Sequence, residues 1–529
     1  MLSKFFGAGR NSWAFWVGCL LVTAGVILHL PMYWMGRHTG FHLADMPMDP
    51  GMMWGMGLIL VGVALTAFGL LPAHQSGGTD EVTILTPPED APLTRAHWLM
   101  CGLLAVALMV DIMKPASLGF VLPGVREEYG LTDAAVALLP FAALAGTVVG
   151  SFAWGWLADI YGRRASILLS SVMFIGTSIC GAMPDFWWNV GMCFMMGAAA
   201  GGLLPVAYAL LAEIMPTRHR GWALVLVGGI GAVGGYFAAS ALSAWLQPDW
   251  GWRIMWFLNL PTGLLLIALS PFLPESARFL QHIGRGAEAR VALARFGAGV
   301  RTATPSAVAE SHSRLPPVDR CHLAVTIALT LAALSWGLVN FGVLLWLPAA
   351  LVAEGRSVEA ASALIAWSTV IAAPTVLISV WLYSAWSTRG SLALMLGLTA
   401  LGLFGFLLRG MGVEALANPI ASLALLIVGS SGVIAIILPY TAENYPLRIR
   451  GRATGWVAGC SKLGGLGAQG LSVLGATPAL GVAAAFVGGL AVVALGLIAV
   501  LGRETRGRDL RDLEETANGL PRLRSGDAA

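Results

Sequence analysis

The sequence predicts an all-α protein that crosses a membrane many times, and three observations support this prediction. Hydrophobic residues make up 57% of the 529 residues. Charged residues make up only 11%, roughly half the share of a soluble domain, and the mean hydropathy is +0.77. Apolar runs long enough to cross the core of a bilayer recur along almost the whole chain. The protein class is therefore a polytopic membrane protein.

Fourteen membrane-spanning helices are expected. They are residues 13–34, 53–72, 98–123, 134–158, 165–183, 187–211, 222–246, 252–273, 323–350, 358–383, 391–408, 418–440, 453–475 and 480–501. Two polar interruptions divide them into a leading pair and two groups of six. The resulting units are an N-terminal transmembrane hairpin (1–72), a cytoplasmic linker (73–96), an N-terminal six-helix half (97–273), a central cytoplasmic loop (274–320), a C-terminal six-helix half (321–503) and a cytoplasmic tail (504–529).

One segment occurs twice, at the end of the fourth helix of each group of six. In both copies a Glu is followed by Pro three residues later and by Arg-Gly seven residues later. The copies are Glu213, Pro216, Arg220 and Gly221, and, 230 residues further on, Glu443, Pro446, Arg450 and Gly451. A matched pair at corresponding points of two halves indicates duplication, as in transporters that rock one half against the other.

The distribution of positive charge predicts the orientation. Of 31 Lys and Arg residues, seven lie in the predicted spans or on the side opposite the central loop, which leaves 24 on the side of that loop and both termini. The seven are Arg37, Lys114, Arg126, Arg253, Arg356, Arg409 and Lys462. Such an excess marks the cytoplasmic side. Both termini are therefore expected in the cytoplasm, and the arginine-rich composition favours a bacterial inner membrane.

The loop "GWLADIYGRR" (155–164), between the second and third helices of the first group, resembles the signature loop of the major facilitator superfamily. The matching positions are Gly155, Asp159, Gly162, Arg163 and Arg164. Residues 274–285 and 251–261 are similar to segments of its sugar-porter and organic-anion branches. The resemblance covers about residues 97–503. It implies a twelve-helix fold of two pseudo-symmetric halves, to which the leading hairpin is an addition.

The loop has the chemistry of a latch between the halves. Gly155 and Gly162 allow close helix approach and a tight turn, and Asp159 can accept hydrogen bonds. Arg163 and Arg164 can reach a carboxylate or a helix C-terminus across the seam between the halves. The expected partners are the acids of the repeated segment, Glu213 beside Arg220 and Glu443 beside Arg450. The alternative is a solvated charge cluster that only follows the topology rules.

Charged residues inside the predicted spans mark a candidate substrate site. Asp111 and Lys114 lie one turn apart in the third span, and Lys462 lies in the thirteenth. A charge at mid-bilayer costs roughly 2.5–3.5 kcal/mol on insertion scales and is rarely kept without a function. Asp111 and Lys114, at i and i+3, share a helix face and are expected to neutralise each other. A purely structural ion pair is the alternative.

We assign substrate binding to Lys114, Lys462 and Asn340, and proton coupling to Asp111. The helices carrying the lysines border the central cavity in the superfamily resembled, and a pair of compact cations suits a carboxylate. Protonation of Asp111 would then release Lys114. The aromatic-acid–proton symporters carry an Asp-Gly-x-Asp pattern in this helix; Asp111 matches its first acid, whereas Lys114 replaces the second.

The connector of the leading hairpin is rich in methionine and histidine. Thioethers with imidazoles are typical of copper(I) sites, but the spacing is irregular and also fits an interfacial anchor. No metal or other cofactor is therefore assigned. The hairpin has no counterpart in the repeated halves, so it is expected to be separable from substrate binding.

The function expected from these features is secondary active transport, with proton-coupled uptake of a small organic anion by alternating access. Efflux of organic molecules by proton antiport, or a membrane sensor that does not transport, are the alternatives. No nucleophile–base set or nucleotide motif favours an enzyme, and no catalytic residue is assigned. The expected partners are the substrate, protons and membrane lipid, without nucleic acid, and the functional unit is expected to be a monomer.

Overall fold

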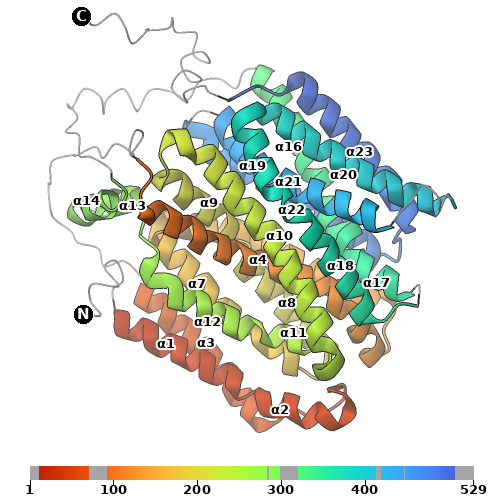
Figure 1. Ribbon diagram of the computed structural model, residues 1–529. Helices are drawn as coiled ribbons and strands as arrows, with labels where there is room; N and C mark the ends of the chain where they lie inside the picture. The colour runs from red at the N-terminus through yellow and green to blue at the C-terminus, as the bar shows by residue number, and fades with distance from the viewer. Residues whose placement is uncertain are drawn as a thin grey trace, which may run out of the picture.

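The computed structural model of the chain is a bundle of long helices (Figure 1). It describes residues 11–70, 92–282, 285–297, 320–353, 355–412, 419–445 and 447–506, and no strand occurs among them. The predicted fold class is confirmed: two halves of six membrane-spanning positions are preceded by a two-helix hairpin.

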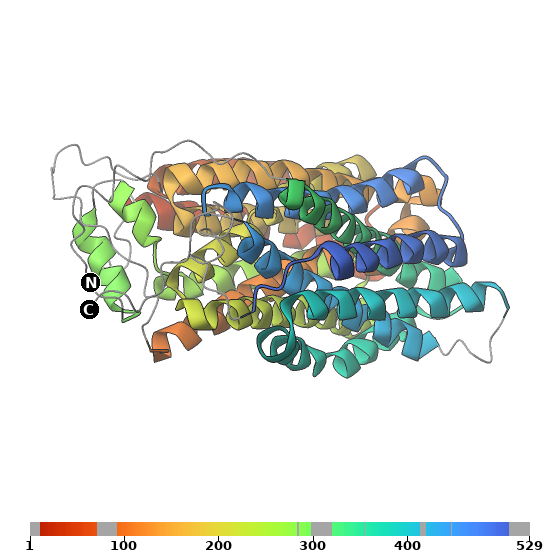
Figure 2. The ribbon, with the colours of Figure 1, turned by 90° about the horizontal axis from the view of Figure 1, so that it is seen from above.

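The first half is built around two long helices, α4 and α10, which pack along each other, and around the pair α6 and α8. Its elements are α4 (Arg95–Tyr129), α5 (Asp133–Val136), α6 (Leu138–Tyr161), α7 (Arg163–Gly176), η3 (Thr177–Ala182), α8 (Phe186–Ala200), α9 (Leu203–Ile214), α10 (Thr217–Trp250), α11 (Ile254–Phe257), α12 (Asn259–Leu269) and η4 (Ser270–Phe272). Two short helices, α13 (Ala277–His282) and α14 (Gly286–Ala294), follow at one end of the bundle (Figure 2).

The second half repeats this plan, with α20 packed along α21 and α23 and with α16 packed along α22. Its elements are α16 (Arg320–Leu338), the π-helical turn η6 (Val339–Val343), α17 (Leu344–Ala353), α18 (Val358–Ala372), α19 (Thr375–Trp381), the π-helical turn η7 (Leu382–Trp386), α20 (Thr388–Gly410), α21 (Pro419–Asn444), α22 (Leu447–Val473) and α23 (Leu480–Leu501). We call the end of the bundle where α13 and α14 lie the inner end, and the opposite end the outer end.

Twelve stretches of the described chain are long and apolar enough to cross a membrane by themselves. The two other predicted spans correspond to α22, which carries many glycines and Lys462, and to the pair α8 and α9. Residues 187–211 were predicted as one helix, but the structure divides them at Gly201 and Gly202. A Cβ on Gly202 would lie 2.1 Å from Cβ of Trp154 on α6. The break therefore lies where α6 approaches this backbone most closely.

The leading hairpin consists of α1 (Ser12–Ile27), α2 (Leu30–Met35), η2 (Gly36–Thr39) and α3 (Pro50–Leu70). Glycines join its two long helices: a Cβ on Gly18 would lie 2.6 Å from the Gly62 carbonyl oxygen, and one on Gly25 equally close to the Gly55 carbonyl oxygen. Such contacts between backbones stabilise helix pairs in lipid. Both helices lie against α7 of the first half (Figure 1).

Candidate functional site

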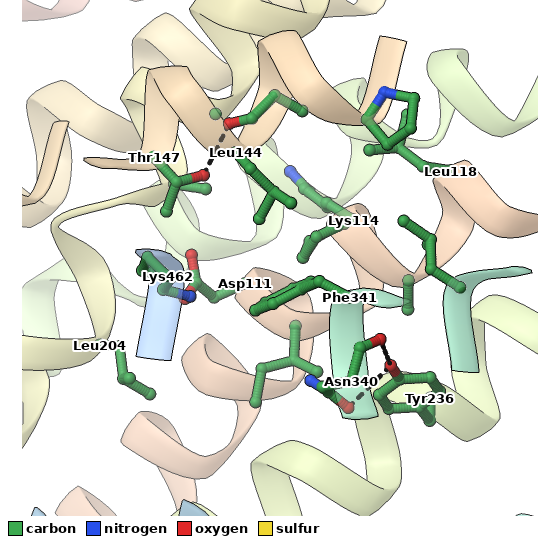
Figure 3. Close-up of a pocket in the computed structure, with 18 of the residues that line it drawn as sticks. Asp111, Lys114, Leu118, Leu144, Thr147, Leu204, Tyr236, Asn340, Phe341 and Lys462 are labelled. Atoms are coloured by element: carbon green, nitrogen blue, oxygen red, sulfur yellow. Dashed lines mark hydrogen bonds between the residues drawn. The ribbon is translucent and has the colours of Figure 1, made fainter. Parts of the chain in front are cut away.

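A cavity lies between the two halves, and all four residues assigned from the sequence to substrate and proton line it. Asp111 and Lys114 come from α4, Asn340 from η6 and Lys462 from α22. The space among the lining atoms, its open part included, amounts to about 890 Å³. Figure 3 shows the four side chains around this space. The structure thus brings together charges that lie up to 351 positions apart, from Asp111 to Lys462.

The expected neutralising pair of Asp111 and Lys114 is not formed. Among the described residues, no ammonium nitrogen lies within 4.0 Å of the Asp111 carboxylate. The Lys114 side chain is 2% exposed, and its Nζ has no hydrogen-bond partner. It lies against the ring of Phe174 on α7, and Figure 3 shows the Lys114 side chain directed away from Asp111. The spacing i and i+3 puts two Cβ atoms on one face, but the long lysine stem is directed into the first half instead.

Lys462 is the cation that Asp111 faces across the seam. Figure 3 shows the two side chains together, and both line the cavity. The Lys462 ammonium also lies 5.0 Å from the centre of the Phe341 ring, at a distance typical of cation–π contacts. Asp111 therefore faces a cation from the opposite half, across the seam.

Asn340 lies in the π-helical turn of the seventh core helix. Its side-chain oxygen accepts a hydrogen bond from the Tyr236 hydroxyl on α10, at 2.9 Å, and its main-chain oxygen accepts one from the same hydroxyl at 3.2 Å. Turns of this kind inside α-helices are frequent at functional sites. This contact joins the two halves at the cavity. It uses only the oxygens of Asn340, so that the side-chain amide nitrogen can still donate a hydrogen bond to a ligand.

The sequence analysis missed the aromatic wall of the cavity. Tyr236, Trp336 and Phe341 all line it. Trp336 is held in place because its Nε1 donates to the Ser430 carbonyl oxygen at 2.8 Å. In a chain with 20 tryptophans and 20 phenylalanines, an aromatic residue in an apolar span carries no signal of its own.

The halves touch on both sides of the cavity. Toward the outer end, the Ser243 and Ser362 hydroxyls are 2.9 Å apart. Toward the inner end, a Cβ on Gly221 of the first half would lie 2.9 Å from the Glu443 carboxylate of the second. Glu443 also accepts hydrogen bonds from the Tyr383 and Thr505 hydroxyls, each at 2.7 Å. The repeated Glu of the second half thus lies at the seam, beside the Arg-Gly segment of the first.

At the inner end, the signature loop is closed by a buried acid that the sequence analysis did not assign. Glu275 Oε1 accepts from the main-chain nitrogens of Arg163 at 2.8 Å and Arg164 at 3.2 Å, which are the first residues of α7. Gly162 has φ +95°, and a Cβ there would lie 2.6 Å from Glu275 Oε2. Only glycine fits such a turn without strain. Burial raises the pKa of the Glu275 carboxyl, and main-chain donors, first that of Ser276, act against this shift.

The second half has a corresponding acid, Glu504, although its copy of the signature loop is reduced to Arg389 and Gly390. Glu504 Oε1 accepts from the Thr388 main-chain nitrogen at 2.9 Å and from the Thr388 hydroxyl at 2.7 Å. Ser387 donates to the other oxygen. Burial alone would raise the pKa of the Glu504 carboxyl, but these donors together lower it. Each half thus uses an acid after its last helix to cap its third helix.

Part of the predicted latch lies outside what the structure describes. This applies to the side chains of Asp159, Glu213 and Arg450, and also to Gly155, for which only the helical backbone is described. Arg220 lies in the first turn of α10. The role of these five residues as a latch stays a prediction.

At the outer end, the hairpin connector closes a buried ion pair. Glu128 and Arg253 form a salt bridge of 2.6 Å, and both side chains are fully buried. The same carboxylate accepts from the main-chain nitrogens of Leu43 at 2.6 Å and Ala44 at 2.9 Å, and from Trp252 Nε1 at 2.8 Å. Leu43 itself is fully buried. The hairpin therefore completes the polar contacts of the first half, and its separability from substrate binding stays a prediction.

Two of the hairpin methionines serve packing. Met32 and Met52 are buried in a cluster with Tyr33 and with residues of α7. The Tyr33 hydroxyl donates to the Trp250 carbonyl oxygen at 2.6 Å. In the described part of the chain, no group of three His, Cys, Asp or Glu side chains is placed to hold a metal ion.

Comparison with known proteins places this architecture among transporters. Residues 99–469 match the Major Facilitator Superfamily, and the hairpin lies outside this match. The chain is 24% identical over 401 residues to the niacin transporter NiaP of Acinetobacter baylyi, covering 72% of this chain and 87% of that protein. It is 27% identical over 408 residues to a gallate transporter of Pseudomonas putida, covering 72% and 89%.

A third relative is the 4-hydroxybenzoate transporter PcaK of Pseudomonas putida, 28% identical over 413 residues, which covers 73% of this chain and 88% of that protein. Among solved structures, the proton:xylose symporter XylE superposes with a TM-score of 0.64 at 18% identity, over 79% of this chain and 98% of that chain. That structural similarity concerns the fold alone.

Proposed function

Because the chain belongs to the Major Facilitator Superfamily, we propose that it is a secondary active transporter that takes up a small organic carboxylate together with protons. The observation that carries the proposal is the pair of lysines, Lys114 and Lys462, which come from opposite halves to one largely apolar cavity. A substrate bound by both lysines would contact both halves, as alternating access requires. Lysines at this depth are rarely kept without a function.

An aromatic carboxylate fits the walls of the cavity best. Tyr236, Trp336 and Phe341 offer ring faces and edges to a planar ring. Niacin, gallate and 4-hydroxybenzoate, the compounds named for the three relatives, share a carboxylate on an aromatic ring. Lys114 stands where the aromatic-acid symporter pattern has its second acid. This departure adds a positive charge that can attract the carboxylate of such a substrate.

Asp111 is the proposed proton carrier, and its site suggests how a proton acts. While ionised, Asp111 attracts Lys462 across the seam. Protonation removes this attraction and leaves the Lys462 ammonium to the substrate. Protonation of Asp111 thereby favours the substrate-bound state. In that state the anionic substrate joins the two halves, and in the substrate-free state the attraction between Asp111 and Lys462 joins them. This assigns to Lys462 the release that the sequence analysis assigned to Lys114.

The proposed location is a bacterial inner membrane, with both termini and the inner end in the cytoplasm. The repeated Arg segments, α13 and α14 are all on the side that carries the excess of Lys and Arg. The hairpin connector then faces the outside.

Uptake of radiolabelled 4-hydroxybenzoate into proteoliposomes tests the proposal. Wild type should accumulate the label when a pH gradient, acid outside, is imposed, and should exchange it without a gradient. Asp111→Asn should still exchange but lose gradient-driven accumulation. Lys114→Ala and Lys462→Ala should weaken binding at least tenfold, because the anion loses a charged hydrogen-bond donor.

Two control variants accompany these. Lys4→Ala removes the third lysine of the chain, and Asp133→Asn removes an exposed acid; neither should change uptake. Binding without accumulation in wild type would favour a sensor, and accumulation only when the gradient is reversed would favour efflux. Gradient-driven uptake in Asp111→Asn would exclude Asp111 as the proton carrier.

A further inference from the structure

A second, smaller cavity lies within the first half, behind Lys114. It has room for about one water-sized group, ≈ 10 Å³, and its lining residues are Lys114, Ser117, Val121, Met196, Met255, Trp256 and Asn259. Lys114 and Met196 also line the large cavity between the halves. The two spaces therefore adjoin at these two side chains.

The small cavity offers hydrogen-bond donors that nothing in the described structure uses. Lys114 Nζ and Trp256 Nε1 are both buried without a hydrogen-bond partner, and their side chains are only 2% and 4% exposed. The Asn259 amide nitrogen makes a long contact of 3.4 Å with the Thr177 hydroxyl. A buried donor without an acceptor costs about 1–3 kcal/mol, and more when it is charged.

The charge balance of this cavity is also incomplete. Among the residues that the structure describes, no acidic side chain lines it. Asp111 lines the large cavity instead, where it faces Lys462. A buried ammonium with no close counterion is unstable in a protein interior. The chemistry that satisfies this ammonium and the indole N–H together is a small anion that accepts hydrogen bonds.

We propose that the small cavity is an anion subsite in which Lys114 and Trp256 bind a monovalent oxyanion or halide, with Asn259 at its wall. The anion is the carboxylate of the transported substrate, whose apolar body stays in the large cavity, or an inorganic anion such as chloride. The proposal rests on the proposed function, since it gives the place of the substrate's acid group. Trp256 is then a residue that determines selectivity for anions, although it lies outside the large cavity.

Trp256→Phe removes the indole N–H and keeps an aromatic ring in place. Trp346→Phe is the matched control, because Trp346 Nε1 is likewise buried without a partner but Trp346 lines neither cavity. In chloride-free gluconate buffer, Trp256→Phe should raise the Kd for 4-hydroxybenzoate about tenfold, as expected for one hydrogen bond to a charged group. The Kd for the neutral 4-hydroxybenzamide should not change, and Trp346→Phe should leave both constants as in wild type.

The inorganic source predicts a different result. If the bound anion is inorganic, chloride should raise the Tm of the substrate-free wild type relative to its Tm in gluconate. This rise should be absent in Trp256→Phe. The Kd of Trp256→Phe for 4-hydroxybenzoate should then equal that of wild type. Asn259→Asp is a second variant that supplies a fixed anion at the cavity wall. It should bind 4-hydroxybenzoate more weakly, or lose the response to chloride, while its Tm in gluconate stays at or above that of wild type.

The proposal is overturned if Trp256→Phe matches Trp346→Phe in both assays, or if Asn259→Asp keeps wild-type anion responses. This outcome is distinct from failure of the proposed function. Normal carboxylate uptake with no effect of Trp256→Phe removes only the subsite. A chloride response that depends on Trp256, in a protein that accumulates no carboxylate in proteoliposomes, keeps the subsite and removes the proposed transport of carboxylates.

Discussion

Replacing Glu128 by Gln tests whether the buried ion pair under the hairpin connector stabilises the fold. The carboxylate accepts hydrogen bonds from Arg253, Trp252, Leu43 and Ala44. The substitution keeps the shape of the side chain but leaves the fully buried Arg253 without its counterion. Breaking a buried pair in this way costs about 3–5 kcal/mol.

The chain provides a matched control a few residues away. Arg126 and Asp133 form a salt bridge of 2.8 Å whose side chains are 56% and 76% exposed. Asp133→Asn breaks this pair by the same chemical change, and exposed pairs contribute only about 0–1 kcal/mol. Titration with SDS in mixed micelles measures the free energy of unfolding of both variants. Equal losses for Glu128→Gln and Asp133→Asn would refute the argument.

A chain that begins near residue 92 tests the part played by the connector. It lacks the Leu43 and Ala44 main-chain donors, each of which is expected to contribute about 1.5–3 kcal/mol as a hydrogen bond to a charged group. Water then reaches Glu128, so Glu128→Gln should cost only about 0–1 kcal/mol in the shortened chain. A cost of about 3–5 kcal/mol in both chains would show that the connector does not close the ion pair.

Two further predictions concern the inner end. Glu443→Gln and Tyr383→Phe should reach the membrane at normal levels but transport slowly, because the contact of Glu443 with Gly221 and Tyr383 closes the seam; unchanged initial rates of uptake would contradict this. Glu504→Gln should lower the Tm at neutral pH. Because hydrogen bonds keep the folded-state pKa of Glu504 below its usual value, the stability it adds is present above the unfolded pKa of about 4.3 and is lost as the pH falls through the folded-state value. The Tm values of wild type and variant should therefore converge in acid, and a difference independent of pH would exclude this role.

The charged lining of the cavity could be predicted from the sequence because a charge inside an apolar span is costly. Asp111, Lys114 and Lys462 stand out against their spans without any knowledge of the fold. Glu128 and Arg253 do not, because both lie near the ends of predicted spans, where charges are common. That they meet, and that the backbone of Leu43 closes their pair, depends on how a connector more than 80 residues away from Glu128 packs.

Where long side chains point could not be predicted either. Spacing places the Cβ atoms of Asp111 and Lys114 on one helix face, but a lysine stem has several rotatable bonds and follows the space that packing leaves. The same limit applies to Trp256, whose unpartnered N–H is visible only in the folded chain. Glycine is ambiguous in a similar way: Gly201 and Gly202 read as a helix interior, but the approach of Trp154 turns them into a break.

The separation of the two lysines has a consequence for coupling. If Lys114 neutralised Asp111 directly, a proton on Asp111 would change the charge within one half only. Because Asp111 instead faces Lys462 of the other half, protonation changes an attraction between the halves. An element that joins two rigid bodies is where a local charge can bias a global equilibrium. Lys114, directed into the first half, then remains available to the anion in both protonation states. We infer that both lysines contribute to binding, and that the coupling of binding to the proton depends chiefly on Lys462.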